Sequence, residues 1–197
     1  MARKKEKLVF GVGVNDYECK IYEKGRAIKA YSVWKEMLRR CYSDKCQAKN
    51  PTYIGCRVAD EWLSFSKFNK WYNENYPKHL EDKVSRLDLD KDLLVEGNKV
   101  YSPETCVFLP HRVNAFLTNK HSSNTSGCTG VDYRKREKKW RARIQDFEIG
   151  ERKSLGYFTD IEDASEAYQR ARAEQCEKAK AWLRELGYAE HIVEKVR

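Results

Sequence analysis

The chain has 197 residues and a formal net charge of +9 at pH 7, so it holds one large or two small domains and favours a polyanionic partner such as nucleic acid. It has no apolar run that could cross a bilayer and no apolar signal core near its start, so we expect neither a membrane partner nor secretion. Seven cysteines without the spacing of a disulfide framework favour the reducing cytoplasm.

Two amphipathic helices are predicted in the first half of the chain, after an N-terminal extension over residues 1–30. Residues 31–42 place an apolar stripe at helical spacing, and residues 62–76 repeat it. The first stripe contains Tyr31, Trp34, Met37 or Leu38, and Cys41. The second contains Trp62, Phe65, Phe68 or Asn69, and Tyr72. Aromatic rings at this spacing form a core more often than a base-stacking platform, so we expect both helices to pack in a core.

The segment 86–114 predicts a strand, a Gly-Asn turn, a second strand and a helix opened by Pro110. This is the layout of a ββα-metal core, in which a hairpin and a helix hold one divalent cation. Asp90 and Asp92 are two residues apart, so an extended strand turns both carboxylates to one side. His111 and Asn114 are three apart and share one face of the helix. Because Mg²⁺ takes oxygen ligands, Asp90, Asp92 and Asn114 are the candidate metal ligands. His111 and Asn114 could either complete the metal shell or orient the phosphate.

Three cysteines of the first half are candidates for a zinc site. Cys41, Cys56 and Cys106 could approach one another in the fold, with His79 as a fourth ligand. The chain has no C-x-x-C pair, which favours buried free thiols over zinc ligands.

A second domain is predicted after residues 119–127, which are small, polar and rich in breakers and predict a linker at 120–127. Beyond it, residues 128–133, 140–147 and 153–158 alternate like three strands. A long helix is predicted over 161–186, capped by Thr159 or Asp160 and stopped by Gly187, with a short terminal helix at 189–196.

The turn between the first two of these strands is strongly basic. Seven of the ten residues 134–143 are Lys or Arg. In an extended strand Arg141 and Arg143 share one face, while Trp140, Ala142 and Ile144 share the other. Such a ribbon fits the DNA major groove, although a solvated charged turn has the same composition. The DNA-binding candidates in this segment are Arg134, Lys135, Arg136, Lys138, Lys139, Arg141 and Arg143.

Residues 126–175 resemble the ethylene-response-factor-type (APETALA-type) DNA-binding domain. The motifs are G-V-x-Y, K-W-R-A-R-I, L-G-Y-F-T-D and E-D-A-S-E-A-Y. The matching framework positions are Gly130, Val131, Trp140, Ala142, Ile144, Leu155, Gly156, Phe158, Ala164, Ala167 and Tyr168. The resemblance implies a three-stranded sheet that lies in the major groove and packs on one helix. By position it also implies that Arg134, Trp140, Arg141, Arg143 and Lys153 face the DNA. Asp132 stands where the plant domains usually carry arginine, so a plant-type target sequence is not implied.

The first half resembles HNH (His-Asn-His) homing-type endonucleases over residues 31–119. The motifs, in order, are Y-S-V-W-K-E-M-L-R-R-C-Y, P-T-Y-I-G-C-R-V-A-D-E-W-L-S-F-S-K-F, L-D-K-D-L and Y-S-P-E-T-C-V-F. Phages and mobile elements encode many of these enzymes, often fused to the DNA-binding domain described above. The resemblance implies that Asp90 binds the metal and that a histidine activates water.

The chain departs from this family at the residues that give it its name. Lys91 stands in place of the catalytic histidine, Thr105 in place of the middle asparagine, and Asn114 near the final histidine. Three interpretations remain: His111 is a relocated base, Lys91 clamps a phosphate while Asp90 or Asp92 manages the water, or the site is inactive. A purely structural role is the simpler alternative. In that case the acids pair with Lys91, Lys99 or Arg112.

We therefore expect an α+β protein. It would have an N-terminal helical domain with an HNH-like core at 31–119, and a three-stranded antiparallel sheet packed on one helix at 128–197, followed by a C-terminal helix. The expected function is site-specific nicking or double-strand cleavage of DNA with Mg²⁺ in the cytoplasm of a phage's bacterial host, without a small-molecule substrate. The alternatives are a catalytically inactive DNA-binding repressor or phage interference factor, and an anti-defence protein whose basic face meets an acidic protein partner.

Overall fold

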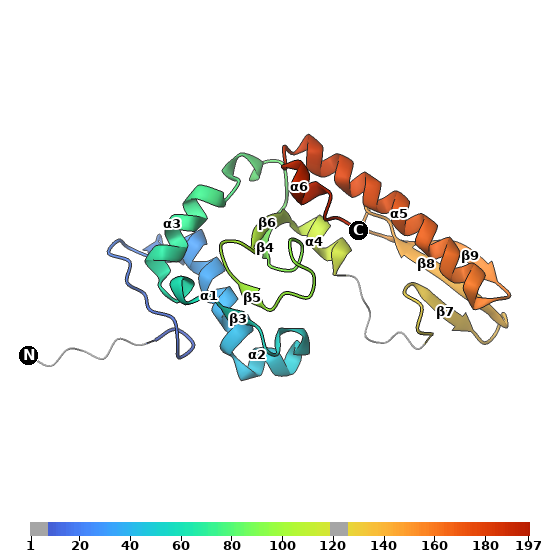
Figure 1. The fold of residues 1–197 in the computed structure, drawn as a ribbon, viewed down its shortest axis with the longest axis horizontal. Coiled ribbons are helices and arrows are strands. Elements are labelled where there is room, and N and C mark those ends of the chain that lie inside the picture. Colours follow the sequence, from blue (N-terminus) through green and yellow to red (C-terminus); the bar gives the residue numbers. More distant parts are fainter. Residues whose placement is uncertain (1–7, 119–125) are drawn as a thin grey trace, which may run out of the picture. The chain divides into compact units, whose positions relative to one another are not determined.

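The computed structural model describes residues 8–118 and 126–197, and it has the expected mixed α+β architecture (Figure 1). The chain divides into two compact units. The first consists of Met1–Glu81 and Leu89–Phe108, and the second of Asp82–Asp88 and Leu109–Arg197. The predicted linker at 120–127 lies mostly outside the described residues, and a domain boundary there stays a prediction.

The first unit is built mainly from short helices. Its helices are α1 (Lys29–Tyr42), α2 (Asp44–Lys49) and α3 (Phe65–Asn75), with 3-10 turns at Pro51–Tyr53, Asp60–Leu63 and Lys78–Leu80. Its short strands are β1 (Tyr22–Glu23), β2 (Arg26–Ala27), β3 (Arg57–Val58) and β5 (Val100–Tyr101). β1 and β2 pair antiparallel, whereas β3 and β5 pair parallel.

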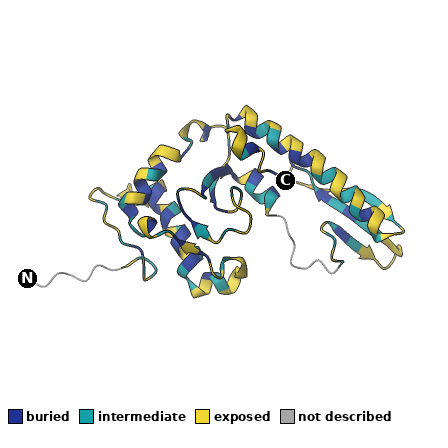
Figure 2. Cartoon of the chain, viewed as in Figure 1, coloured by how far each residue is buried: buried dark blue, intermediate teal, exposed yellow. Residues whose placement is uncertain are grey.

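The apolar face predicted for α1 is confirmed. All of its predicted members are buried: Tyr31, Trp34, Met37, Leu38 and Cys41. The Trp34 indole N–H donates a hydrogen bond of 2.7 Å to the carbonyl oxygen of Trp62, so burial leaves this donor satisfied. Figure 2 shows buried residues along α1 and α3 beside exposed ones, the pattern of helices packed on one side.

The second predicted helix is confirmed, but it begins later than expected. The Ser64 hydroxyl accepts the backbone N–H of Lys67 and caps α3, so the α-helix begins at Phe65. Trp62 instead lies in the preceding 3-10 turn. The predicted apolar members are nevertheless all buried, namely Trp62, Phe65, Phe68, Asn69 and Tyr72.

The hairpin predicted across the Gly97-Asn98 turn is wrong. The chain after this turn forms two strands, β5 and β6 (Val107–Pro110), and it is β6 that pairs with β4 (Leu87–Asp90). A turn separates the two strands, because the Cys106 N–H donates to the carbonyl of Ser102 over 3.0 Å. The predicted helix then follows as α4 (His111–Leu117).

The C-terminal part of the second unit is a three-stranded antiparallel sheet packed on a helix, as expected. The strands are β7 (Val131–Arg134), β8 (Lys139–Gln145) and β9 (Arg152–Phe158), in that order. The helices are α5 (Ile161–Glu185) and α6 (Glu190–Val193). α5 runs along one face of the sheet (Figure 1). Within the described residues no helix is both long and apolar enough to span a membrane.

The helix approaches the sheet so closely that one position tolerates only glycine. Val131, Ala142 and Ala164 form the buried centre of this interface, and the Tyr168 ring packs against them. Gly130 has a φ of +75°, and a Cβ there would lie 2.2 Å from Tyr168 ring carbons and 2.7 Å from the Arg143 carbonyl oxygen. The backbone needs both the positive φ and the missing side chain.

α4 is attached to the C-terminal elements of the same unit by aromatic and cationic side chains. The Phe116 ring meets the Phe147 ring edge-on at 5.6 Å, and the Arg172 guanidinium lies 3.7 Å from the Phe116 ring centre. Arg172 also donates to the Phe116 carbonyl over 3.2 Å. The Arg112 guanidinium lies 4.9 Å from the Trp182 ring centre. Cation–π contacts of this kind stabilise by about 0.5–2 kcal/mol each, so α4 and α5 are packed as one body.

Candidate functional site

Asp90 is the last residue of β4. One of its carboxylate oxygens accepts the backbone N–H of Asp92 at 2.9 Å and of Leu93 at 2.7 Å, which turns the chain out of the strand. Burial raises the pKa of Asp90 against the lowering effect of these two hydrogen bonds. The sequence placed Asp90 and Asp92 on one side of an extended strand, but the chain already turns between them.

Lys91 is buried and bound within its own loop. Its ammonium is only 6 % exposed, and it donates to the Asp92 carboxylate at 2.5 Å and to the Asn98 carbonyl at 2.8 Å. The Asn98 amide in turn donates to the carbonyls of Lys91 and Val100, each over 2.7 Å. These bonds close the loop between β4 and β5, which favours a structural role for Lys91 over a phosphate clamp.

His111 belongs to a polar cluster within the second unit. Its Nδ1 lies 2.6 Å from an Asp88 carboxylate oxygen, and the Asn114 amide donates to the same oxygen over 3.2 Å. The Arg86 Nε donates to the other Asp88 oxygen over 2.8 Å. Burial alone would raise the pKa of Asp88, but the hydrogen bonds from His111, Asn114 and Arg86 outweigh it and hold this pKa lower than that of an ordinary aspartate. Asp88 is therefore ionised and orients the His111 imidazole. The sequence analysis did not identify Asp88 as a site residue.

The geometry favours one tautomer of His111. Its Nδ1 lies 2.6 Å from both the Asp88 carboxylate and the Arg86 Nη2, yet one ring nitrogen cannot donate and accept at once. A hydrogen bond to an ionised carboxylate is the stronger of the two, so we assign the proton to Nδ1, donated to Asp88. The lone pair then lies on Nε2. In this tautomer Nε2 accepts from the Arg86 Nη2 at 3.3 Å, and with the side chain 46 % exposed it is an oriented base on the solvent side of the cluster.

Asn114 contributes a buried acceptor to the same cluster. Its amide nitrogen is bonded to Asp88, but its side-chain oxygen is buried and has no hydrogen-bond partner. An unsatisfied buried oxygen is costly and typically has a ligand in the working state. A hard cation or a bound water would satisfy it. Across residues 8–118 and 126–197, no group of three or more His, Cys, Asp or Glu side chains forms a ready metal site.

The three candidate zinc ligands are all buried: Cys41, Cys56 and Cys106. Burial raises the pKa of Cys41 and of Cys106 to about 12. Both thiols are therefore protonated and neutral at pH 7 unless an ion displaces the proton.

The basic side chains of β7 and β8 lie on the face of the sheet opposite α5. Residues directly opposite in an antiparallel pair point to the same face, and Asp132 is opposite Arg141, which is opposite Tyr157. Ala142, the next residue along β8, is buried against the α5 side. The face formed by Asp132, Arg134, Lys139, Arg141, Arg143, Ser154 and Tyr157 is called the arginine face below. Tyr157 is 46 % exposed there, and its place was not predicted.

The arginine face is organised around one carboxylate. Asp132 receives the Arg141 Nη2 at 3.0 and 3.1 Å, the Arg143 Nη2 at 3.1 Å and, more distantly, the Arg134 Nη1 at 3.8 Å. Three of the predicted DNA-binding residues are thus brought together. The acid that joins them, Asp132, stands where the plant domains that residues 126–175 resemble usually carry arginine.

The other predicted DNA-binding residues are placed differently. Lys135, Arg136 and Lys138 are exposed in the turn between β7 and β8, and Lys138 has a φ of +51°. Trp140 packs with the interface to α5, on the face opposite Arg141. Lys153 is exposed and lies opposite the buried Ile144, away from the arginine face.

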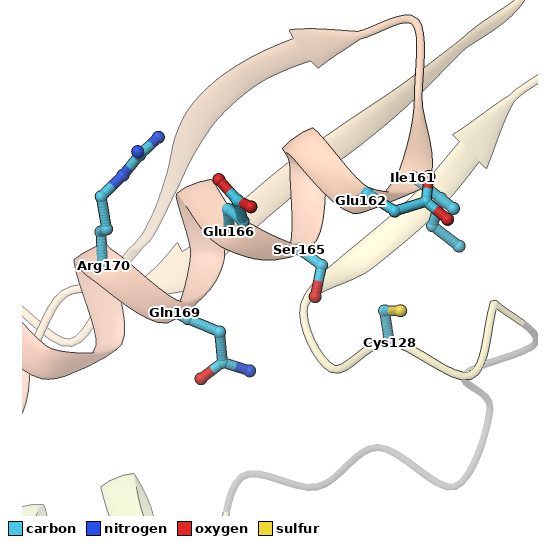
Figure 3. Close-up of a pocket in the computed structure, with 7 residues that line it drawn as sticks. All are labelled: Cys128, Ile161, Glu162, Ser165, Glu166, Gln169 and Arg170. Atoms are coloured by element: carbon cyan, nitrogen blue, oxygen red, sulfur yellow. The ribbon is translucent and has the colours of Figure 1, made fainter.

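A shallow hollow of about 580 Å³ lies between α5 and the loop before β7 (Figure 3). It is lined by Cys128, Ile161, Glu162, Ser165, Glu166, Gln169 and Arg170. These residues lie on the helix side of the sheet, so the hollow is separate from the arginine face and adds no chemistry to the histidine cluster.

The chain matches no protein-family model, no curated protein and no solved structure. The geometry of the site and the chemistry of its residues therefore carry the argument for function.

Proposed function

We propose that this chain is a site-specific, metal-dependent DNA endonuclease whose C-terminal sheet binds duplex DNA and whose histidine cluster cleaves or nicks it. In this proposal the first half derives from phage or mobile-element HNH-type nucleases, and residues 126–175 form an ethylene-response-factor-type domain. One observation carries the proposal. An oriented, water-accessible imidazole and a clustered arginine face occur in one compact unit.

The arginine face has the chemistry of a duplex-binding surface. Guanidinium groups donate in a planar fork that matches phosphates and the O6 and N7 acceptors of guanine. A two-stranded ribbon fits the width of the major groove. The exposed Tyr157 ring adds an amphipathic surface beside Arg141.

The histidine cluster has the chemistry of a general base. In hydrolysis, a water oxygen forms a bond to phosphorus, the bond to a bridging oxygen of the backbone breaks, and the water loses a proton. In this step the water replaces the 3.3 Å contact from the Arg86 Nη2, the His111 Nε2 takes the proton, and the adjacent anionic Asp88 stabilises the imidazolium that results. Arg86, whose side chain is largely exposed, adds positive charge beside the base for a phosphate to approach.

A divalent cation completes this proposal. Mg²⁺ would stabilise charge on the scissile phosphate and the leaving oxygen. The predicted ligands carry oxygen donors, the kind Mg²⁺ prefers, and the Asn114 side-chain oxygen has no hydrogen-bond partner. Asp90 and Asp92 lie in the first unit and Asn114 in the second, so Asp90, Asp92 and Asn114 are to be tested separately, each by its own variant.

A plasmid assay tests the proposal. The wild-type chain is expected to nick or linearise supercoiled plasmid carrying a bound site with Mg²⁺, and to stop when EDTA is added. His111→Ala is expected to lose this activity and to keep its DNA affinity, because it leaves the sheet untouched. His191→Ala, on α6, is the matched control and should cleave like wild type. Cleavage retained in His111→Ala would move the base elsewhere.

A second function, a DNA-binding repressor or interference factor without catalysis, is favoured by one specific observation. Asp90 stands at the position of the metal-binding acid of the nuclease motif, and Lys91 replaces its catalytic histidine. Here both side chains form hydrogen bonds within their own loop. This alternative predicts salt-sensitive DNA binding and no cleavage with Mg²⁺, Mn²⁺ or Zn²⁺. A single turnover on a cognate plasmid would eliminate it. A chain without any salt-sensitive DNA affinity would support an anti-defence protein with an acidic protein partner instead.

A further inference from the structure

The arginine face contains one acidic residue, Asp132. A negative charge repels DNA phosphates, so its presence on a proposed DNA-binding surface needs a separate explanation. Asp132 lies directly opposite Arg141 in the β7–β8 pair. Both of its oxygens accept hydrogen bonds from Arg141, and one also forms an ion pair with the Arg143 Nη2 at 3.1 Å. Arg141 is the most enclosed of the arginines here, with its side chain 17 % exposed. The carboxylate is thus bound to the guanidinium groups and not simply adjacent to them.

Without the carboxylate the arginines would repel one another. Arg134, Arg141 and Arg143 each place a guanidinium nitrogen within 3.8 Å of Asp132, so the three positive charges are crowded around one point. A single surface ion pair contributes little, but a network of one carboxylate with several guanidinium groups restricts all of them. Restricting a side chain before binding lowers the entropy cost of the complex.

We propose that Asp132 is a positioning residue for DNA recognition: it fixes the guanidinium groups of Arg141 and Arg143 in one arrangement and thereby raises discrimination between DNA sequences. This inference rests on the proposed DNA binding. It also implies a cost, because the carboxylate repels phosphates and occupies donors that would otherwise bind them. Asp132 should therefore weaken non-specific binding while it sharpens specific binding.

The hydrogen bonds argue against direct base reading by Asp132. A carboxylate that reads a base accepts from the N4 amino group of cytosine. Here the Asp132 oxygens already accept three contacts of 3.0–3.1 Å from Arg141 and Arg143. Those contacts use Nη2 of Arg141 and Nη2 of Arg143, and Nε of Arg141 donates to the same carboxylate over 3.4 Å. The carboxylate therefore leaves Nη1 of Arg141, and Nε and Nη1 of Arg143, for DNA. The arginines are the readers, and the acid sets their geometry.

The test compares Asp132→Asn with wild type on two DNA probes. One is a duplex enriched from a random library by the wild-type chain, and the other is a scrambled duplex of the same composition. Affinity for the scrambled duplex should rise about fivefold, as expected for one unit charge removed roughly 4–5 Å from a phosphate in water. The ratio of the two affinities should fall roughly tenfold, because a bidentate arginine–base pair discriminates at about this level. The salt slope should steepen by about 0.9 for each arginine that gains a phosphate.

Two further variants separate positioning from simple charge and from folding. Glu174→Gln removes one exposed negative charge from α5 and should leave the ratio unchanged. Asp132→Ser also lacks the carboxylate and should behave like Asp132→Asn; a difference between them would attribute the effect to packing and overturn the proposal. Thermal unfolding of each variant confirms that the sheet is intact.

The outcomes distinguish this role from the proposed function. If the wild-type chain has no salt-sensitive duplex affinity, both are overturned. If wild type binds and Asp132→Asn keeps the specific-to-scrambled ratio within twofold, only the positioning role is overturned. An independent readout without DNA is the ¹⁵N heteronuclear NOE of the Arg141 Nε–H. It should be that of an ordered side chain in wild type and of a mobile one in Asp132→Asn.

Discussion

Replacing Asp88 by asparagine should remove catalysis while leaving DNA binding in place. The carboxylate accepts hydrogen bonds from three side chains: His111 at 2.6 Å, Arg86 at 2.8 and 3.5 Å, and Asn114 at 3.2 Å. Its side chain is 13 % exposed, so water replaces these partners poorly. Asparagine keeps the size of the side chain but loses the negative charge and turns one acceptor into a donor.

Both the rate and the stability should change by amounts that follow from this geometry. An amide N–H facing His111 favours the tautomer with its proton on Nε2, which removes the basic nitrogen from the water side. Loss of a positioned general base lowers the rate by about 10²–10⁴-fold. Hydrogen bonds to a charged group stabilise by about 1.5–3 kcal/mol each when buried. Because His111 and Arg86 are largely exposed, we expect a total loss of roughly 2 kcal/mol.

The assay is the initial rate of plasmid nicking with Mg²⁺, measured beside urea unfolding and duplex affinity for the same preparations. Asp82→Asn is the matched control, since this exposed acid lies in the same short segment of the second unit. It should leave all three quantities unchanged. Nicking by Asp88→Asn within threefold of wild type would refute the assignment of His111 as an Asp88-oriented base.

Three further predictions test the packing around these sites. Gly130→Ala should lower the free energy of unfolding by about 3 kcal/mol or more, because it combines a positive φ with a clash against Tyr168, and a urea titration would measure this. Arg172→Ala should destabilise the second unit by roughly 1–3 kcal/mol through loss of the Phe116 ring and carbonyl contacts; amide exchange in α4 that stays as slow as in wild type would contradict it. The Asp88 pKa is lowered by folding, so its stabilisation should be complete well above pH 3.8 and lost as the pH falls through the folded value. Asp88→Asn should flatten the acid limb of the stability curve, and an unchanged limb would show that Asp88 does not titrate as assigned.

The C-terminal architecture could be predicted from the sequence because its signals are local. Alternation over residues 131–134 and 139–145 fixes the strand faces, and small residues at helical spacing mark the side of α5 that lies on the sheet. The expectation that Arg141 and Arg143 share a face follows from the same alternation. The role of Asp132 could not be read this way, because it depends on the cross-strand register.

In the first half of the chain the helices could be predicted from the sequence, but the pairing of the strands could not. β3 and β5 have two residues each, and they pair in parallel across more than forty residues of chain. Such short strands leave no periodic signal, so the turn at 102–106 that separates β5 from β6 was invisible in the sequence.

The histidine cluster shows a similar limit. Asp88 and Asp90 occupy equivalent alternate positions on β4, and the family resemblance selects Asp90. In the fold the Asp90 carboxylate accepts hydrogen bonds from the backbone that directly follows it. The Asp88 carboxylate instead binds His111, which is 23 residues away in the sequence. Only tertiary structure separates the two acids.

The most direct test of DNA binding by the arginine face is the salt dependence of duplex affinity for wild type and Arg141→Ala/Arg143→Ala. Wild type should lose affinity steeply between 50 and 200 mM salt, and the double variant should bind more weakly with a slope smaller by about 1.8, or about 0.9 for each phosphate contact removed. Arg170→Ala/Lys178→Ala removes two exposed positive charges from α5 and should keep the wild-type slope. An unchanged slope in Arg141→Ala/Arg143→Ala would contradict the account, because DNA would then bind elsewhere or not at all.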